Sequence, residues 1–504
     1  MSNAVIKHYA VYRSLMPGLQ VFIMIGLILS PKVNADNEFL QWKAQQAQSY
    51  QEYKDKRDRE FAEFLKMHWT EIQLLKGVER DSQPKPVVMP VAKIEPVAPA
   101  DKPADDIPTQ PETPVVIIPL TVPVPVDVLP QQPEPAYEKK GRRINLKFYG
   151  TPLTLYYDGK LKTPLANRID NDAVSGFWSA LSRADYDGLI KQLEAQRTAL
   201  QLNDWAYLLL VNDITKQIYP GSENQQTLLT WFVLAKSGYK ARIAYDSHGV
   251  YLLMPSNQPL YSTPYFTYEK LRYYAVQLDG SDQTLGNVYT YAGQYPGTNK
   301  HLDMALKRDM VIIDRPAKRK LSFTFEGRHY DIDVSYDAKR VDFLGTYPQL
   351  DLGVYFGSNV SSTTAASLLL QLSEDMQGMG EQQAVNFLLS FVQSSLKYKT
   401  DELQFGKENY LFPEETLYYP YSDCEDRSIL FAWLVKSLLG LEVVGLVYPG
   451  HVATAVHLVD NVKGDAISHN GKNFVVADPT FVNAVVGMTM PDYINRNPEI
   501  IELQ

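Results

Sequence analysis

The stretch "SDCEDRSILFAWLVKS", residues 422–437, joins a helix-start signal to the only cysteine in this chain of 504 residues. Ser422 and Glu425 stand three residues apart just before a long apolar run, which is the S-x-x-E pattern of a capping box. Cys424 is therefore expected in the first helical turn, where free backbone N–H groups and the helix dipole lower the pKa of a thiol. The neighbouring carboxylates act in the opposite direction, so the thiol needs an imidazolium partner.

The segments after this helix carry two further residues of catalytic type. Gly440 is expected to end the helix, and "LEVVGLVYPG" is typical of a strand that delivers His451 at its far turn. The later segment "KNFVVADPTF" is typical of another strand, with Asp478 at its end. Cys424, His451 and Asp478 thus follow one another at intervals of 27 residues, in the order of nucleophile, base and orienting carboxylate.

A buried, inert thiol is the ordinary interpretation of a lone cysteine, and a single cysteine excludes an internal disulfide. The histidine and aspartate favour catalysis instead. In that hypothesis Cys424 attacks an acyl carbon, His451 takes and returns the proton, and Asp478 holds the imidazole tautomer. The backbone N–H of Cys424 is one oxyanion donor, and Tyr419 or Tyr421 is a candidate for a second.

The motifs "SDCEDRS", "YPGHVATAV" and "VVADPTF", within residues 384–481, resemble the catalytic core of the transglutaminase-like superfamily. The resemblance implies a papain-related α+β fold, in which the nucleophile starts a central helix packed on an antiparallel sheet. It places the family's triad on Cys424, His451 and Asp478 and implies no cofactor. Because the superfamily includes cross-linking enzymes, cysteine proteases, amidases and members without catalysis, it implies a mechanism rather than one substrate.

An earlier segment repeats the same pattern. "SENQQTLLTWFVLAKS" at 222–237 aligns with 422–437 at an offset of 200 residues, and each is followed by a β-like run and Tyr-x-x-His, which ends at His248 in the first copy. Asn224 takes the place of the cysteine, and Asp279 is the nearest counterpart of Asp478. We therefore expect two tandem modules, a degenerate one at 141–318 and a catalytic one at 319–504.

The N-terminal third is expected to contain three further segments. Residues 1–35 combine early basic residues, an apolar run at 19–29 and small Ala35, which is the order of a secretory signal peptide, with an uncleaved anchor as the alternative. Residues 36–82 place apolar side chains, including Trp69 and Ile72, at helical spacing and predict an amphipathic helical segment. Residues 83–140 hold 15 of the 32 prolines and predict a disordered tether.

Composition narrows the class of partner. A formal net charge of −9 without a long Lys/Arg stripe argues against nucleic acid, and one cysteine among acidic neighbours is a poor zinc site. We expect a periplasmic or secreted thiol enzyme, a hydrolase or acyltransferase, that acts on peptide or amide bonds of a protein or peptide, for example an envelope protein or cell-wall peptide. Contact with membrane is expected only through the signal or anchor. The alternative is a non-catalytic envelope scaffold that binds through both modules.

Overall fold

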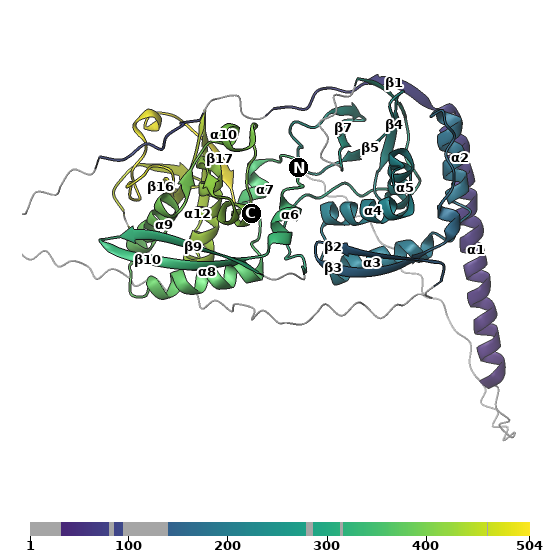
Figure 1. Ribbon diagram of the computed structural model, residues 1–504, viewed down its shortest axis with the longest axis horizontal. Coiled ribbons are helices and arrows are strands. Elements are labelled where there is room, and N and C mark those ends of the chain that lie inside the picture. The colour runs from purple at the N-terminus through teal and green to yellow at the C-terminus, as the bar shows by residue number, and fades with distance from the viewer. Residues whose placement is uncertain are drawn as a thin grey trace, which may run out of the picture. The chain divides into compact units, whose positions relative to one another are not determined.

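The computed structural model describes residues 32–79, 85–93, 140–278, 286–312, 316–460 and 462–503. The chain divides into two units, Met1–Lys56 and Arg57–Gln504, and the strands of the described residues lie in the second (Figure 1). The expected signal peptide lies outside the described residues except for its last four, which begin a helix at Lys32. Among the described residues no helix is long and apolar enough to cross a membrane.

The segment expected to be helical over 36–82 changes structure within its length. Helix α1 (Lys32–Met67) ends at Met67, and strand β1 (Trp69–Gln73) begins two residues later. The prediction was wrong for Trp69 and Ile72, because β1 pairs antiparallel with strand β8 (Asn287–Tyr291) more than 200 residues later. Helical spacing over one short run does not reveal a pairing partner so distant in the sequence.

The first half of the second unit is built around a six-stranded antiparallel sheet of order β1-β8-β4-β5-β7-β6. A two-stranded hairpin, a 3-10 helix and four α-helices precede most of its strands: β2 (Arg142–Phe148), β3 (Thr151–Tyr157), η1 (Gly159–Leu161), α2 (Asn171–Leu181), α3 (Asp187–Ala199), α4 (Asp204–Ile218) and α5 (Glu223–Lys236). The strands of the sheet that follow them are β4 (Arg242–Tyr245), β5 (Val250–Pro255), β6 (Tyr265–Tyr268), β7 (Leu271–Val276) and β8.

The second half contains a five-stranded antiparallel sheet of order β15-β16-β14-β13-β17. Its elements, in order, are β9 (Ala317–Phe325), β10 (Arg328–Tyr336), α6 (Ala338–Leu344), α7 (Leu352–Phe356), α8 (Ser362–Asp375), α9 (Glu381–Ser395), β11 (Lys397–Tyr398), α10 (Asp401–Phe405), α11 (Pro413–Tyr418), β12 (Tyr421–Ser422), α12 (Cys424–Leu439), β13 (Val443–Tyr448), β14 (His451–Val456), β15 (Ala466–His469), β16 (Lys472–Ala477), η2 (Pro491–Tyr493) and β17 (Glu499–Glu502). The prediction of an α+β chain with antiparallel sheets is confirmed.

Helix α12 lies at the centre of this half. It packs on strands β13 and β14 and on helix α9, and its side chains are buried on almost every face. Gly440 ends it with a backbone φ of 65°, in the left-handed region that glycine adopts without strain. A helix that is apolar all round must run through a core, which places its start at the edge of that core.

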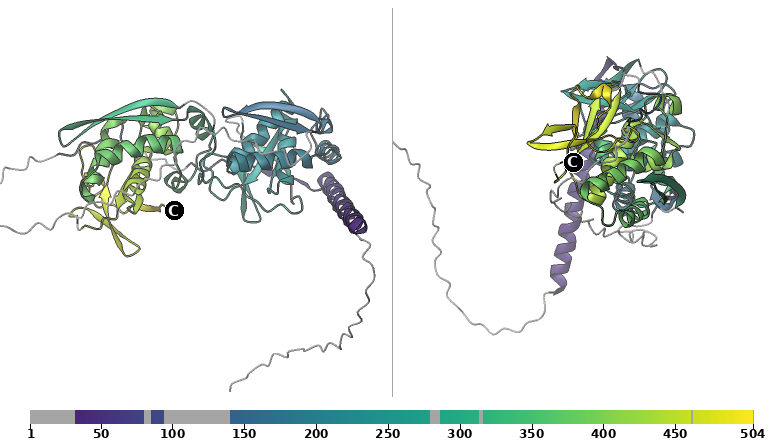
Figure 2. Two further views of the ribbon diagram at one scale, coloured as in Figure 1. Left: turned by 90° about the horizontal axis from the view of Figure 1, so that it is seen from below. Right: turned by 90° about the vertical axis from the view of Figure 1, so that its left-hand side faces the viewer.

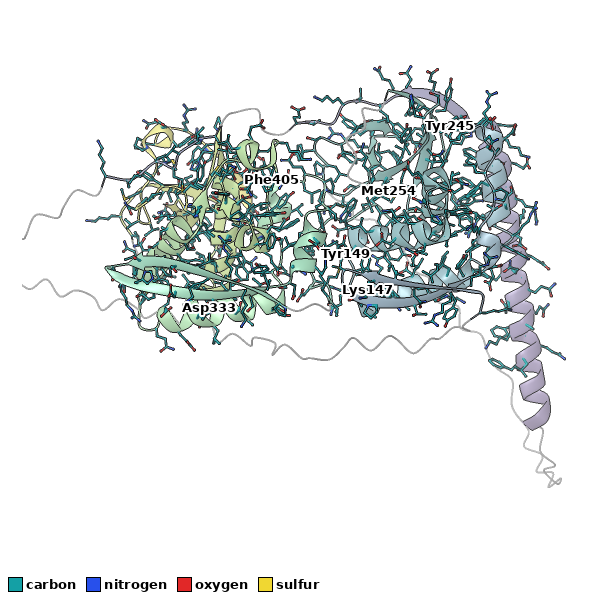
Figure 3. All side chains as sticks on the ribbon, viewed as in Figure 1. Lys147, Tyr149, Tyr245, Met254, Asp333 and Phe405 are labelled. Carbon is teal, nitrogen blue, oxygen red and sulfur yellow. The ribbon has the colours of Figure 1, made fainter. Side chains whose placement is uncertain are left out.

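The two halves repeat one order of elements, a hairpin followed by helices and then an antiparallel sheet. The β2–β3 and β9–β10 hairpins each pack on helices of their own half, as Figure 2 shows. The halves also contact each other: the ring of Tyr149, labelled in Figure 3, lies 5.4 Å from that of Phe343, and one hydrophobic cluster includes residues of both. The described part of the proline-rich segment, residues 85–93, packs on the second half.

Candidate active site

A tight turn positions His451. Strands β13 and β14 form a hairpin in which Tyr448 pairs with His451, so only Pro449 and Gly450 form the turn. Gly450 has a φ of 75°, which glycine tolerates at the second central position of a type II turn, and proline suits the first. The turn therefore fixes His451 at the first position of β14, where its side chain is 2% exposed.

A buried hydrogen bond joins His451 to Asp478. Strand β14 pairs with β16, and Asp478 directly follows β16, so the two side chains meet at one end of the sheet. Nε2 of His451 lies 2.8 Å from Oδ2 of Asp478, while Oδ1 of Asp478 accepts hydrogen bonds from the backbone and hydroxyl of Thr480 at 2.9 and 2.7 Å. Burial alone would raise the pKa of Asp478, but His451 and Thr480 lower it below its usual value.

The start of α12 lies beside the same end of the sheet. Cys424 is the first residue of α12, and one turn later the Ser428 hydroxyl donates to the backbone carbonyl of Val452 at 3.0 Å. Val452 directly follows His451 on β14. Cys424 therefore starts a helix beside the end of the sheet at which His451 and Asp478 are hydrogen-bonded, while its thiol is bonded to Glu425 rather than to the imidazole.

The capping residues differ by one position from the predicted ones. Asp423 is the N-cap of α12, and its backbone N–H donates to Oδ2 of Asp426 at 3.2 Å. Ser422 lies on the short strand β12 instead and accepts a hydrogen bond from Arg427. The prediction that Ser422 and Glu425 form the capping box was thus wrong by one residue, because Asp423 and Asp426 form it instead.

The electrostatics of the thiol also differ from the prediction. Burial raises the pKa of Cys424, and Glu425 raises it further, whereas Lys85 lowers it. The thiol donates a hydrogen bond to Oε2 of Glu425 at 3.1 Å. The expected lowering by the helix start is therefore outweighed, since the cysteine is 1% exposed and a carboxylate is its hydrogen-bond partner.

An acidic pocket surrounds this thiol, and a lysine from the proline-rich segment fills it. The ammonium of Lys85 forms ion pairs with Glu408 and Glu425 and lies 3.2 Å from Oδ2 of Asp423. Burial alone would lower the pKa of Lys85, but these carboxylates raise it above its usual value, so the ammonium stays charged. Burial and the neighbouring acids raise the pKa of Asp401, which adjoins the pocket, to about 10.

Asp401, Asp423 and Glu425 place one carboxylate oxygen each within 4.8 Å of one another, a spacing compatible with a metal ion. Lys85 pairs with two of the three, so in this arrangement the ammonium supplies the positive charge that the cluster needs. No sequence pattern indicates this lysine, because it lies 340 residues before Glu425 in a stretch predicted to be a tether.

Two further residues organise the site and were missed. Arg427 is buried and donates to the Leu396 carbonyl at 2.7 Å and to the Gln393 carbonyl at 3.3 Å, which ties α12 to the end of α9. Tyr398 lies on β11, which pairs in parallel with β12 so that Tyr398 stands opposite Ser422. Burial raises the pKa of Tyr398, and the neighbouring carboxylates of Asp423 and Glu425 add to that rise.

Tyr419 and Tyr421, the two predicted candidates for the second oxyanion donor, each pack their rings against a neighbouring side chain. The ring of Tyr419 packs on Phe405, labelled in Figure 3, at 5.4 Å. The ring of Tyr421 lies under the Lys399 ammonium at 5.3 Å. Tyr398 is thus a further candidate, and the one sequence signal for it is an aromatic residue just before the acidic "TDE" helix start.

The corresponding position of the first half serves a structural purpose. Asn224, in the first turn of α5, accepts a hydrogen bond from the backbone N–H of Val250 at 2.9 Å. His248 is exposed and pairs with Asp246, and both Asn224 and His248 line a cavity of about 240 Å³. Asp279 lies outside the described residues.

His457, in the second half, lies one residue beyond β14. One of its ring nitrogens, Nδ1, lies 2.9 Å from the Asn473 carbonyl oxygen, as suits a structural residue.

Comparison with protein-family models, curated proteins and solved structures finds no match to this chain.

Proposed function

We propose that this chain is an exported, periplasmic or secreted thiol enzyme with a transglutaminase-like, papain-related catalytic half that acts on peptide or amide bonds. The observation that carries the proposal is the buried His451–Asp478 hydrogen bond beside the start of α12. Because Nε2 of His451 donates to Asp478, Nδ1 is left as the proton acceptor for Cys424. The first half is then a degenerate copy that supports the second.

The reaction needs one rearrangement of the thiol. Sγ of Cys424 turns from Glu425 towards Nδ1 of His451, transfers its proton there and attacks the acyl carbon. The C–N bond of the tetrahedral intermediate breaks as His451 returns that proton to the leaving amine, which gives a thioester. His451 then takes a proton from water, or from an acceptor amine, as that molecule attacks the thioester carbon. The C–S bond breaks, and the imidazolium returns the proton to the leaving Sγ. Asp478 holds the tautomer and stabilises the imidazolium.

The charge that develops on the substrate oxygen needs donors. The backbone N–H of Cys424, at the first position of α12, is one, and the Tyr398 hydroxyl is the candidate for the second. Its donor capacity is supported by the hydrogen bond that the hydroxyl donates to a peptide carbonyl, that of Pro86, at 2.7 Å. Hydrolysis is favoured over transfer, since no feature of the sequence marks a dry site for an acceptor amine.

A test is to incubate the full chain with mixed synthetic peptides and to measure new N-termini, released ammonia and, with hydroxylamine present, hydroxamate. We expect products from the wild type and from His457→Ala, and none from Cys424→Ala or His451→Ala. New N-termini or ammonia indicate hydrolysis, whereas hydroxamate indicates transfer. Equal product from Cys424→Ala would show that the proposed mechanism is wrong.

A second candidate function is a non-catalytic scaffold that binds protein or cell-wall peptide. The observation in its favour is the buried thiol, whose S–H donates a hydrogen bond to Glu425 and whose pKa is raised. A scaffold is expected to bind peptides equally well with Cys424→Ala and to release no product. The peptide assay above therefore separates the two functions.

A further inference from the structure

Residues 85–93 cross the candidate site from one end to the other. At one end the Lys85 side chain, 4% exposed, fills the acidic pocket beside Cys424. At the other end Ala92 is buried against Phe481, close after Asp478 in the sequence. The segment thus begins at the nucleophile and ends beside the loop that carries the orienting carboxylate.

Backbone hydrogen bonds hold the segment as an extended peptide. The Ala92 N–H donates to the Val482 carbonyl at 2.8 Å, and the Val482 N–H donates to the Pro90 carbonyl at 3.0 Å, which makes a parallel β-bridge around Val91. Edge pairing of this kind is how many proteins bind extended peptide ligands. The loop after Asp478 therefore provides a peptide-binding edge, and residues 90–92 occupy it.

The segment also engages the candidate oxyanion donor. The Tyr398 hydroxyl donates to the Pro86 carbonyl at 2.7 Å. A substrate carbonyl is the group expected to accept that hydrogen bond during catalysis. One peptide carbonyl of the segment thus occupies a donor that the proposed reaction requires.

Two apolar residues in the middle of the segment are left exposed. Val87 and Val88 are 66% and 78% exposed, whereas the Lys85 side chain and Ala92 are buried and Met89 accepts a hydrogen bond from Arg427. A core element is expected to bury most of its apolar side chains. Two buried ends with an exposed apolar middle are instead typical of a ligand that binds through a few anchoring residues.

We infer that residues 85–93 are an internal inhibitory segment that occupies the substrate groove over Cys424 and must leave before a peptide substrate enters. The inference rests on the proposed function for its meaning, but access to the thiol is measurable without catalysis. Lys85 and Ala92 are the two anchors, and the occupied groove recognises an extended peptide that carries a cationic side chain.

Iodoacetamide alkylation of Cys424 in the full chain tests this inference, because the rate follows the fraction of molecules with the segment released. Ala92→Asp places a charge among Phe481, Ala484 and Met490, away from the thiol, and should release the segment. Val91→Asp adds the same charge one residue earlier, where the side chain is 61% exposed, and is the matched control. We expect alkylation to accelerate about tenfold or more in Ala92→Asp and less than about twofold in Val91→Asp.

A second variant, in which glycine and serine replace residues 85–93 at equal length, covers the case in which Ala92→Asp does not fold. The synthetic peptide KPVVMPVAK, added to either released variant, should slow alkylation again. Folded variants that alkylate at the wild-type rate would overturn the inference.

The same comparison in a His451→Ala background separates this inference from the proposed function. Release of the segment should raise the alkylation rate by the same factor there, whether or not His451 is a catalytic base. An acceleration in both backgrounds without any peptide turnover would support the inhibitory segment and contradict the enzyme. Turnover without any acceleration would do the reverse.

Discussion

Replacing Asp478 by asparagine changes the proton position on His451 and little else. The asparagine oxygen can keep the two hydrogen bonds from Thr480, which are 2.7 and 2.9 Å in the wild type. Its NH₂ group then faces Nε2 of His451, which must become the acceptor. The ring proton moves to Nδ1, so the nitrogen that serves Cys424 is no longer a base.

The size of the effect follows from this tautomer change. Loss of the correct tautomer in a comparable triad lowers the rate about 10⁴-fold, which corresponds to about 5.4 kcal/mol of transition-state stabilisation. Fold stability should change much less, by roughly 1 kcal/mol, because a neutral hydrogen bond replaces a charge-assisted one. Since the pKa of Asp478 is lowered in the folded state, the difference in stability holds at neutral pH and disappears as pH falls below about 4.

The assay is acylation by p-nitrophenyl acetate of the full chain carrying Ala92→Asp, so that access to the thiol does not limit the rate; it is monitored by p-nitrophenol release, and urea unfolding measures stability. Asp465→Asn is the matched control, because Asp465 is exposed and its carboxylate accepts a hydrogen bond from the backbone N–H of Thr489, which an asparagine oxygen can also accept. We expect Asp465→Asn to match the Ala92→Asp chain in both measurements. An Asp478→Asn protein that is folded and retains more than about a tenth of the acylation rate would refute the tautomer argument.

Three other predictions concern two buried groups near the candidate site, Glu415 and Arg427, and the corresponding position in the first half, Asn224. Burial raises the pKa of Glu415 to about 8, so the free energy of unfolding of the wild type should fall by up to about 1.4 kcal/mol per pH unit between pH ~5 and ~8. Glu415→Gln should flatten that slope in urea unfolding, whereas Glu402→Gln, at an exposed position, should leave it unchanged. Arg427→Lys loses donors to two buried carbonyls and should cost about 2–4 kcal/mol, whereas Arg496→Lys at the surface should cost less than about 0.5 kcal/mol; an equal melting temperature for both would contradict this. Asn224→Cys should yield no acyl-enzyme at residue 224 by peptide mapping, since the first half lacks a buried histidine–carboxylate pair at that site among the residues described; a second acylated thiol would disprove it.

The positions of Cys424, His451 and Asp478 in the fold could be predicted because each residue lies at the boundary of a strongly patterned element. The apolar run of α12 fixes the helix that Cys424 begins, and the Pro-Gly turn fixes the hairpin that presents His451. Asp478 follows a run of valines before a proline, which indicates the end of a strand. Local periodicity and turn residues are sufficient for these positions.

The state of the site could not be predicted in the same way. Lys85 reaches Asp423 across 338 residues of sequence, and no local pattern marks such an ion pair. The direction of the Cys424 pKa depends on that pocket, since burial and Glu425 outweigh the helix start only in the folded chain. The strand pairing of Trp69 was missed for the same reason, as its partner Tyr291 lies on a distant strand.

The central claim is that Cys424 accepts an acyl group with His451 as its base. The most direct measurement is peptide mapping of the acetylated chain after a rapid acid quench of its reaction with p-nitrophenyl acetate, carried out in the wild type and in Ala92→Asp so that access does not limit the rate. The account predicts one acetyl group on Cys424, formed about 100-fold more slowly or worse in His451→Ala and at an unchanged rate in His457→Ala. Acetylation at another residue, or equal rates in the two histidine variants, would contradict it.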